Sequence, residues 1–241
     1  MAQANHQHHG KEMGQIDRGA RVASRLAGVR LLLPLGWALA AIGYYGPWIN
    51  HATAALTLSG GDMAEFVKFL PGVLAGNLHL VRQLFYLPPL AVVAGVAFLV
   101  ASERLAYPWL LRLLALLLCV PLSLQLLPPA WSPASLATPE FRPQAIALLL
   151  SWLMLAAFWF LSRLPAWLCG LLAARRSLAG IVLPAWQMAL AKPAIDAVYG
   201  NPPAMGWGVF LCLAGLAVVF LTSLVLALQA RRRDVGLWVG G

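Results

Sequence analysis

Side chains able to act on a substrate gather between two apolar stretches, from Asn50 to Gln83. Carboxylates, an imidazole and a guanidinium are groups used for acid–base catalysis and for binding anions. If this loop folds back on itself, these groups meet at one surface, where they suit an anionic or lipid-linked substrate. The candidates in this stretch are His51, Asp62, Glu65, His79 and Arg82, and Glu140 and Arg142 in a later loop can join them.

Two of these residues are histidines at the two ends of the loop, and an imidazole pair can hold a metal, a haem or a pigment. His51 follows the first apolar stretch and His79 precedes the second. Little other ligand chemistry surrounds them, and haem between helices needs histidines inside the apolar stretches, which contain none. We therefore expect histidines that bond to loop backbone, and we predict no metal site and no cofactor.

A second polar group lies near the end of a later apolar stretch. Lys192 and Asp196 are one helical turn apart and can pair, and Tyr199 follows them. Ionisable residues near a membrane interior are functional candidates because they are costly to bury. Pro184 and Gln187 precede them, and a proline at this position can break a helix in the way that transporters use. This pattern indicates a substrate or ion pathway, unless the group merely lies at the aqueous interface.

The motifs of common enzyme classes are missing from the sequence. It has no phosphate-binding Walker loop, no His-Glu-x-x-His, no Cys-x-x-Cys, no Gly-x-Ser-x-Gly and no dinucleotide fingerprint. The three cysteines fall within or close to the apolar stretches, so no disulfide is expected; they are Cys119, Cys169 and Cys212. No catalytic residue is predicted from these patterns.

The elements that position these residues are apolar helices. Of the 241 residues, 61% are hydrophobic and 10% charged, whereas soluble domains have about 45–50% and about 25%. The apolar residues form uninterrupted runs near the length of about 20 residues that crosses a bilayer. The predicted fold is an all-α transmembrane bundle over 29–230, between a polar tail (1–28) and a basic C-terminus (231–241). Six spans are predicted, at about 31–49, 84–101, 109–127, 145–161, 178–199 and 207–228.

The distribution of basic residues decides whether the fifth run, 178–199, crosses the membrane. If it crosses, 13 of the 17 lysines and arginines lie on one side; if it does not, the division is 11 against 6. Because basic residues near span ends stay cytoplasmic, we expect six spans, a plasma (inner) membrane location and both termini inside, with five spans as the alternative. The net charge of +9 then reflects topology and anionic lipid headgroups rather than nucleic acid.

A short helix is predicted in the first loop, which this topology places outside. Ser59 and Asp62 can cap its start, and Pro71-Gly72 ends it. An apolar stripe predicts that it lies in the interface plane, either packed over the mouth of the bundle or acting as a lid or partner-docking helix. The stripe consists of Met63, Phe66, Val67 and Leu70.

The N-terminal tail contains His6, His8 and His9. These histidines can be interpreted as part of a solvated tail, as a metal site or as the remnant of a tag. Little ligand chemistry surrounds these histidines, which favours the solvated tail. The leader before the first span is too long and polar for a cleavable signal, so we expect the N-terminus to be kept.

Small residues line one face of two spans and allow close helix contact, within the chain or with another subunit. They are Gly36, Ala40 and Gly43 in the first span, and Ala91 and Gly95 in the second.

Three functions are compatible with these patterns. The one we expect is a non-catalytic subunit that packs against other membrane proteins. The alternatives are a permease or transporter component, and a membrane enzyme acting at the outer face. The expected partners are membrane lipids and other membrane-protein subunits.

Overall fold

The computed structural model describes residues 27–51, 56–128, 131–161, 163–199 and 202–238. The predicted polar tail therefore lies outside the described residues except for its last two. The described chain is mostly helical, which confirms the predicted helical bundle. In order, its elements are a first helix (Ala27–Tyr45), β1 (Pro47–His51), β2 (Leu56–Ser59), α2 (Gly60–Phe66), the 3-10 helix η1 (Val67–Phe69), α3 (Pro71–Leu74), η2 (Arg82–Tyr86), α4 (Leu87–Leu99), α5 (Trp109–Leu124), α6 (Pro133–Leu136), α7 (Arg142–Ala156), α8 (Phe158–Leu161), α9 (Ala166–Val198), β3 (Ala204–Met205) and α10 (Trp207–Trp238).

Four helices are long and apolar enough to cross a membrane: Ala27–Tyr45, Arg82–Leu99, Ala166–Val198 and Trp207–Arg232. Two shorter apolar helices, α5 and α7, correspond to the predicted third and fourth spans. The predicted fifth span is part of a longer helix, because α9 begins at Ala166 rather than near 178. It also continues as one helix through Pro184 and Pro193, so the break considered for a transporter is not found.

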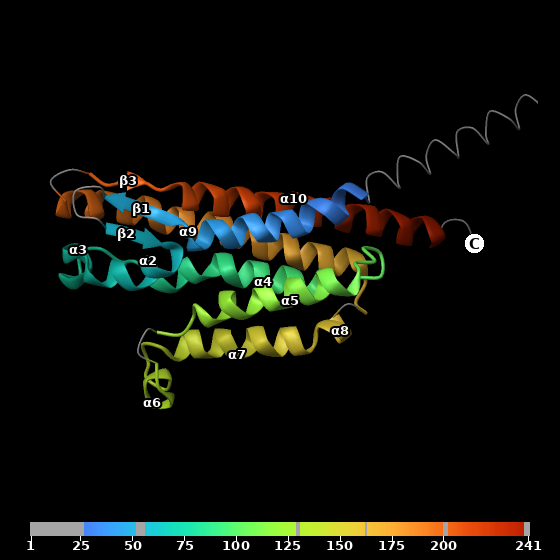
Figure 1. The fold of residues 1–241 in the computed structure, drawn as a ribbon, viewed down its shortest axis with the longest axis horizontal. Helices are drawn as coiled ribbons and strands as arrows, with labels where there is room; N and C mark the ends of the chain where they lie inside the picture. Colours follow the sequence, from blue (N-terminus) through green and yellow to red (C-terminus); the bar gives the residue numbers. More distant parts are fainter. Residues whose placement is uncertain (1–26, 52–55, 129–130, 162, 200–201, 239–241) are drawn as a thin grey trace, which may run out of the picture.

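The long elements run back and forth between two ends of the molecule (Figure 1). One end carries β1, β2, β3, α2 and α3 and is called the sheet end below; the other carries the α4–α5 loop, α8 and the end of α10. Helix α4 is the centre of the bundle, since every residue from 91 to 100 is buried. It packs mainly against α9, and also against α5, α7 and α10.

The small-residue faces are used inside the chain. A Cβ added at Gly43 would lie 2.1 Å from the backbone nitrogen of Cys212, and one at Gly215 would lie 2.3 Å from that of Ala40. The first helix and α10 therefore touch backbone to backbone. On α4, Ala91 lies next to Gly180 of α9 and Gly95 faces the indole of Trp37. The sequence left open whether these small-residue faces make contact within the chain or with another subunit, and in the structure they make contact within the chain.

A small antiparallel sheet, in the order β2-β1-β3, caps one end and corrects the predicted boundary of the first span. The sequence predicts a span that continues to residue 49, but the helix ends at Tyr45 and the chain turns at Gly46-Pro47 into a strand. Trp48 remains buried and donates from Nε1 to the carbonyl oxygen of Gly43 at 3.1 Å. A β-bulge in the first strand pair and a bond from the Gly206 amide to the Trp48 carbonyl complete the sheet.

The bundle exposes many large apolar side chains on its surface and buries several polar ones between its helices. Leucine, valine and tryptophan side chains stand exposed along α5, α7, α9 and α10, while several polar side chains are buried between helices. The buried hydroxyls of Ser123, Ser151 and Thr222 each bond to a carbonyl of their own helix, as they do in membrane helices. These apolar helices indicate a membrane protein.

Candidate functional site at the sheet end

The predicted loop helix is found in part: the predicted capping residues begin α2, but α2 ends at Phe66 and the 3-10 helix η1 continues to Phe69. Pro71, which was predicted to end the helix, is the first residue of α3. Ser59 accepts from the Asp62 amide at 3.3 Å, while the Asp62 carboxylate accepts from the Ser59 amide at 2.9 Å and from its hydroxyl at 2.7 Å. This is a capping box, which satisfies two amides that the first turn leaves free. The Asp62 carboxylate therefore serves as part of the cap of α2.

The apolar stripe of this helix faces the protein. Met63, Val67 and Leu70 are buried and Phe66 is partly buried against the same core. Of the roles considered for the helix, this arrangement matches packing over the mouth of the bundle.

Four charged side chains next to α2 form one ion-pair cluster, made of Glu65, Lys68, Arg82 and Glu140. Arg82 contacts Glu65 at 2.6 Å through one terminal nitrogen, and Glu140 at 3.3 Å through the other. Lys68 contacts the same two carboxylates, at 2.7 Å and 3.1 Å. Every charge in the cluster thus has two opposite partners. The cluster joins α2 and η1 to η2 and to the residue two positions before α7.

Aromatic residues complete the surroundings of the ion-pair cluster. The Tyr86 hydroxyl donates to Glu65 at 3.3 Å. The ring of Phe141 lies 5.1 Å from the Arg82 guanidinium and 5.7 Å from the Lys68 ammonium, which are cation–π distances. Arg82 has only 9% of its side chain exposed, whereas Glu140 has 50%. The Arg82 guanidinium is therefore a buried anchor, and Glu140 is the member of the cluster that is most exposed to solvent.

The electrostatics of the cluster keep both kinds of group ionised. Partial burial by itself raises the pKa of Glu65, but the hydrogen bond from Lys68 and the charge of Arg82 outweigh it and leave that pKa lowered. Burial likewise opposes charging of Lys68, but its bonds to Glu65 and Glu140 raise its pKa overall. A carboxylate with a lowered pKa is a poor general acid or base at neutral pH. This arrangement is suited to holding segments together rather than to moving protons.

A cavity of about 350 Å³ opens beside the cluster. Lys68, Arg82 and Glu140 form its polar side, and Val67, Val73 and Leu80 its apolar side. Because the charges that reach it already have opposite partners, a charged ligand here would compete with these ion pairs.

The other loop candidates lie outside this cluster. His51 ends β1, where its backbone pairs with Leu56. His79 is exposed between α3 and η2, and Arg142 is exposed in the first turn of α7, against a different cavity. In the part of the chain that the structure describes, no three histidine, cysteine, aspartate or glutamate side chains stand together as metal ligands. Of the residues that the sequence grouped, the structure brings together Glu65, Arg82 and Glu140.

On α9, Lys192 and Asp196 form an ion pair with each other, as expected for residues one turn apart. Both side chains are partly exposed, at 24% and 30%. One turn earlier, the buried side chain of Gln187 accepts from the amide of Val81 at 2.9 Å, which holds the start of η2 against α9. Tyr199 is half-buried directly after the helix.

Sequence reasoning missed Lys68, Tyr86 and Phe141 as members of the ion-pair cluster. The spacing of three between Glu65 and Lys68 is a helical pairing distance, and this is the local signal that could have found Lys68. No local sequence pattern connects Glu65 or Lys68 to Glu140, which lies 72 positions after Lys68.

The fold and its sheet-end cluster thus define a helical membrane protein whose loop cap is fastened by ion pairs. Comparison of the chain with protein-family models, curated proteins and solved structures gives no match.

Proposed function

We propose that the chain is a non-catalytic, six-span subunit of a larger membrane complex, and that the outward face of α5 and α7 is where a neighbouring membrane protein packs. The observation that carries this proposal is a contrast within the described residues. Most of the charged groups predicted to do chemistry are used by the fold, in ion pairs or as a helix cap, while a broad apolar face on two adjacent helices has no covering element.

The polar side of this contrast comes from the site. Arg82 forms ion pairs with Glu65 and Glu140, Asp62 caps α2, and Lys192 pairs with Asp196. An enzyme acting at the outer face needs a reacting group free to meet substrate, and a transporter needs a charge that changes partner. The paired geometry favours a structural role over both alternatives.

The apolar side comes from α5 and α7, which lie on one side of α4, with α7 at the edge of the bundle (Figure 1). Their main contacts are with α4 and with each other, strengthened by a bond from the Trp152 indole to the Ser123 hydroxyl at 3.0 Å. A helix attached along one side leaves the rest of its circumference to lipid or to a partner helix. The large side chains on this outward face are Leu110, Leu113, Leu114, Leu117, Leu149, Leu150 and Leu153.

The six-span topology belongs to the same proposal. The first helix, α4, α5, α7, α9 and α10 alternate in direction, so their connections fall at alternate ends (Figure 1). The basic residues Arg30, Arg104 and Arg163 are then at the end opposite the sheet, where the Arg30 guanidinium donates to the Ala106 carbonyl at 3.1 Å. That end is cytoplasmic by the charge bias.

Photocrosslinking in the native membrane tests the partner face. A photoreactive amino acid replaces Leu149 on α7, and a matched control replaces Leu221 on α10, because the two leucines are 60% and 57% exposed. The proposal expects a protein crosslink from position 149 and only lipid adducts from position 221. It also expects the crosslinked protein to co-purify stoichiometrically after gentle extraction. A monomeric native mass with lipid adducts alone at both positions would contradict it.

A further inference from the structure

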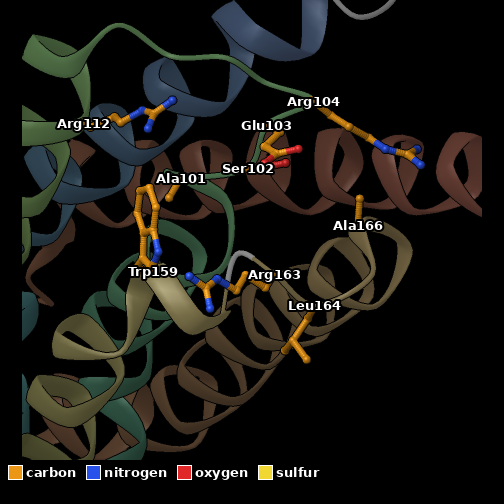
Figure 2. A pocket seen from close by; sticks show the side chains of 9 residues that line it. All are labelled: Ala101, Ser102, Glu103, Arg104, Arg112, Trp159, Arg163, Leu164 and Ala166. Carbon is orange, nitrogen blue, oxygen red and sulfur yellow. The ribbon is translucent and has the colours of Figure 1, made fainter.

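At the end opposite the sheet lies a pocket of about 420 Å³ that the proposed function does not use (Figure 2). It is formed where the α4–α5 loop, the first turn of α5, helix α8 and residues 163–166 meet. Its lining residues are Ala101, Ser102, Glu103, Arg104, Arg112, Trp159, Arg163, Leu164 and Ala166.

Two of its arginines are held in place by contacts that leave much of the guanidinium available. Arg112 donates from Nε to the carbonyl oxygen of Tyr107 at 2.8 Å, so its two terminal amino groups are left for a ligand. The Arg163 guanidinium lies 5.4 Å from the centre of the Phe160 ring, a cation–π distance that involves none of its N–H groups in a hydrogen bond to that ring. Their side chains enter the pocket from opposite sides of Trp159 (Figure 2).

The charge of the pocket is positive. Three arginines and one glutamate among the lining residues leave a net charge of two positive. Arg104 extends away from Trp159 and Arg163, on the side where Ala166 lies, and Glu103 lies between Arg112 and Arg104 (Figure 2). Guanidinium groups bind the oxygens of a phosphate through paired N–H donors. Unlike the ion-pair cluster at the sheet end, this pocket has more positive than negative groups.

The remaining wall of the pocket is apolar. The Trp159 indole is 53% exposed at one side, and Leu164 is 37% exposed nearby. A tryptophan next to basic side chains at a helix end is typical of the headgroup region of a bilayer. Basic pockets between membrane helices on the cytoplasmic side bind anionic headgroups. The combination of cationic and apolar walls fits a phosphate attached to a less polar group.

From these contacts we propose that the pocket binds the phosphate of an anionic ligand through Arg112 and Arg163. The phosphate comes either from a glycerophospholipid headgroup or from a soluble phosphate ester. The site does not depend on the subunit proposal, because a monomeric protein in detergent contains every residue of it.

Binding of three probes to the purified full chain in neutral detergent tests the site by native mass spectrometry. The probes are phosphatidylglycerol, phosphatidylcholine and glycerol 3-phosphate. Replacing Arg112 and Arg163 together by glutamine should weaken the preferred anionic probe by about tenfold per arginine, which corresponds to about 1.4 kcal/mol each. The matched control replaces Arg175 and Arg176, exposed arginines on α9 outside the pocket. That pair should change binding by about twofold or less, because exposed charges act only through a screened field.

The outcomes separate the two sources of phosphate. Selective loss of phosphatidylglycerol identifies a lipid site, and selective loss of glycerol 3-phosphate identifies a soluble ligand. Equal losses in both arginine pairs, or equal binding of phosphatidylglycerol and phosphatidylcholine with no binding of glycerol 3-phosphate, would overturn the proposal. If the pocket variant does not fold, the unaltered protein decides: photoreactive phosphatidylglycerol or a photoreactive phosphate ester must crosslink within 159–166, and crosslinks confined to other segments would equally overturn it.

Discussion

Gly215 of α10 lies so close to the first helix that a single methyl group there should separate the two helices. A Cβ at this position would be 2.3 Å from the backbone nitrogen of Ala40, whereas Cβ contacts below 3.0 Å essentially do not occur. The neighbouring atoms are also backbone, at Gly36 and Ala40, so no side chain can rotate away. Gly28, at the start of the first helix, has nothing within 4 Å of its added Cβ and provides the matched control.

The expected magnitude follows from the size of the overlap. To relieve it, the two backbones must part by about 0.7 Å, and a gap of about 0.5–1 Å forfeits about a quarter to a half of each dispersion contact across it. Overpacking of this kind costs about 1–3 kcal/mol. Both Gly→Ala changes gain up to about 0.5–1 kcal/mol from helix propensity. The difference between the two variants therefore isolates the clash, and Gly28→Ala should be neutral or stabilising.

The assay is reversible unfolding in mixed micelles, followed by circular dichroism, with Gly215→Ala, Gly28→Ala and the unaltered chain compared at the same detergent composition. We expect Gly215→Ala to have a free energy of unfolding lower than that of Gly28→Ala by about 1–3 kcal/mol. Equal free energies for the two variants would refute the backbone contact between the first helix and α10.

Other consequences of the structure can be measured in the same way. Arg82→Ala leaves two carboxylates without their buried partner and should destabilise the fold by about 3 kcal/mol, which is the lower end of the range for buried pairs because Glu140 is half exposed. Arg142→Ala, at an exposed arginine, should cost less than about 0.5 kcal/mol. Similar losses of stability in both variants would contradict the anchoring role of Arg82. Because the pKa of Glu65 is lowered, its contribution is present above the unfolded value of about 4.3 and is lost as pH falls through the folded value. Because the pKa of Lys68 is raised, its contribution to stability is present below the unfolded value of about 10.4 and is lost as pH rises through the folded value. The free energy of unfolding, measured across a pH series, should therefore show a plateau between an acid and an alkaline decline, and the acid decline should be smaller in Glu65→Gln. The three cysteines are buried and free, so a maleimide should leave the folded protein unlabelled and modify it after denaturation; labelling before unfolding would show that the packing around them is wrong.

Much of the fold could be predicted because apolar runs and capping residues act locally. Ser59 and Asp62 predicted the start of α2, since a capping box needs only residues three apart. The boundary at Tyr45 was missed because Trp48 and Ile49 are apolar and buried in a strand as they would be in a span. The start of α9 was missed because the uninterrupted apolar run begins only after Arg175 and Arg176, which are exposed on a helix that begins at Ala166.

The site was less predictable because its contacts join distant segments. The sequence indicated that Glu65, Arg82 and Glu140 can gather, but not that Lys68 would neutralise the group or that Asp62 would be used as a cap. The pairing of Lys192 with Asp196 was predictable because it lies within one helical turn. The pocket at Arg112 and Arg163 depends on how α5 and α8 pack, which no local pattern specifies.

The central claim, that the helices cross a bilayer with the sheet end outside, is tested most directly by cysteine labelling in intact cells. His79→Cys places a thiol on the exposed surface of the sheet end, and Arg232→Cys places one at an exposed position in the last two turns of α10, while the natural cysteines are buried. A membrane-impermeant maleimide should label His79→Cys in intact cells and Arg232→Cys only after permeabilisation. Labelling of Arg232→Cys from outside, or of neither thiol without disrupting the cells, would contradict this orientation.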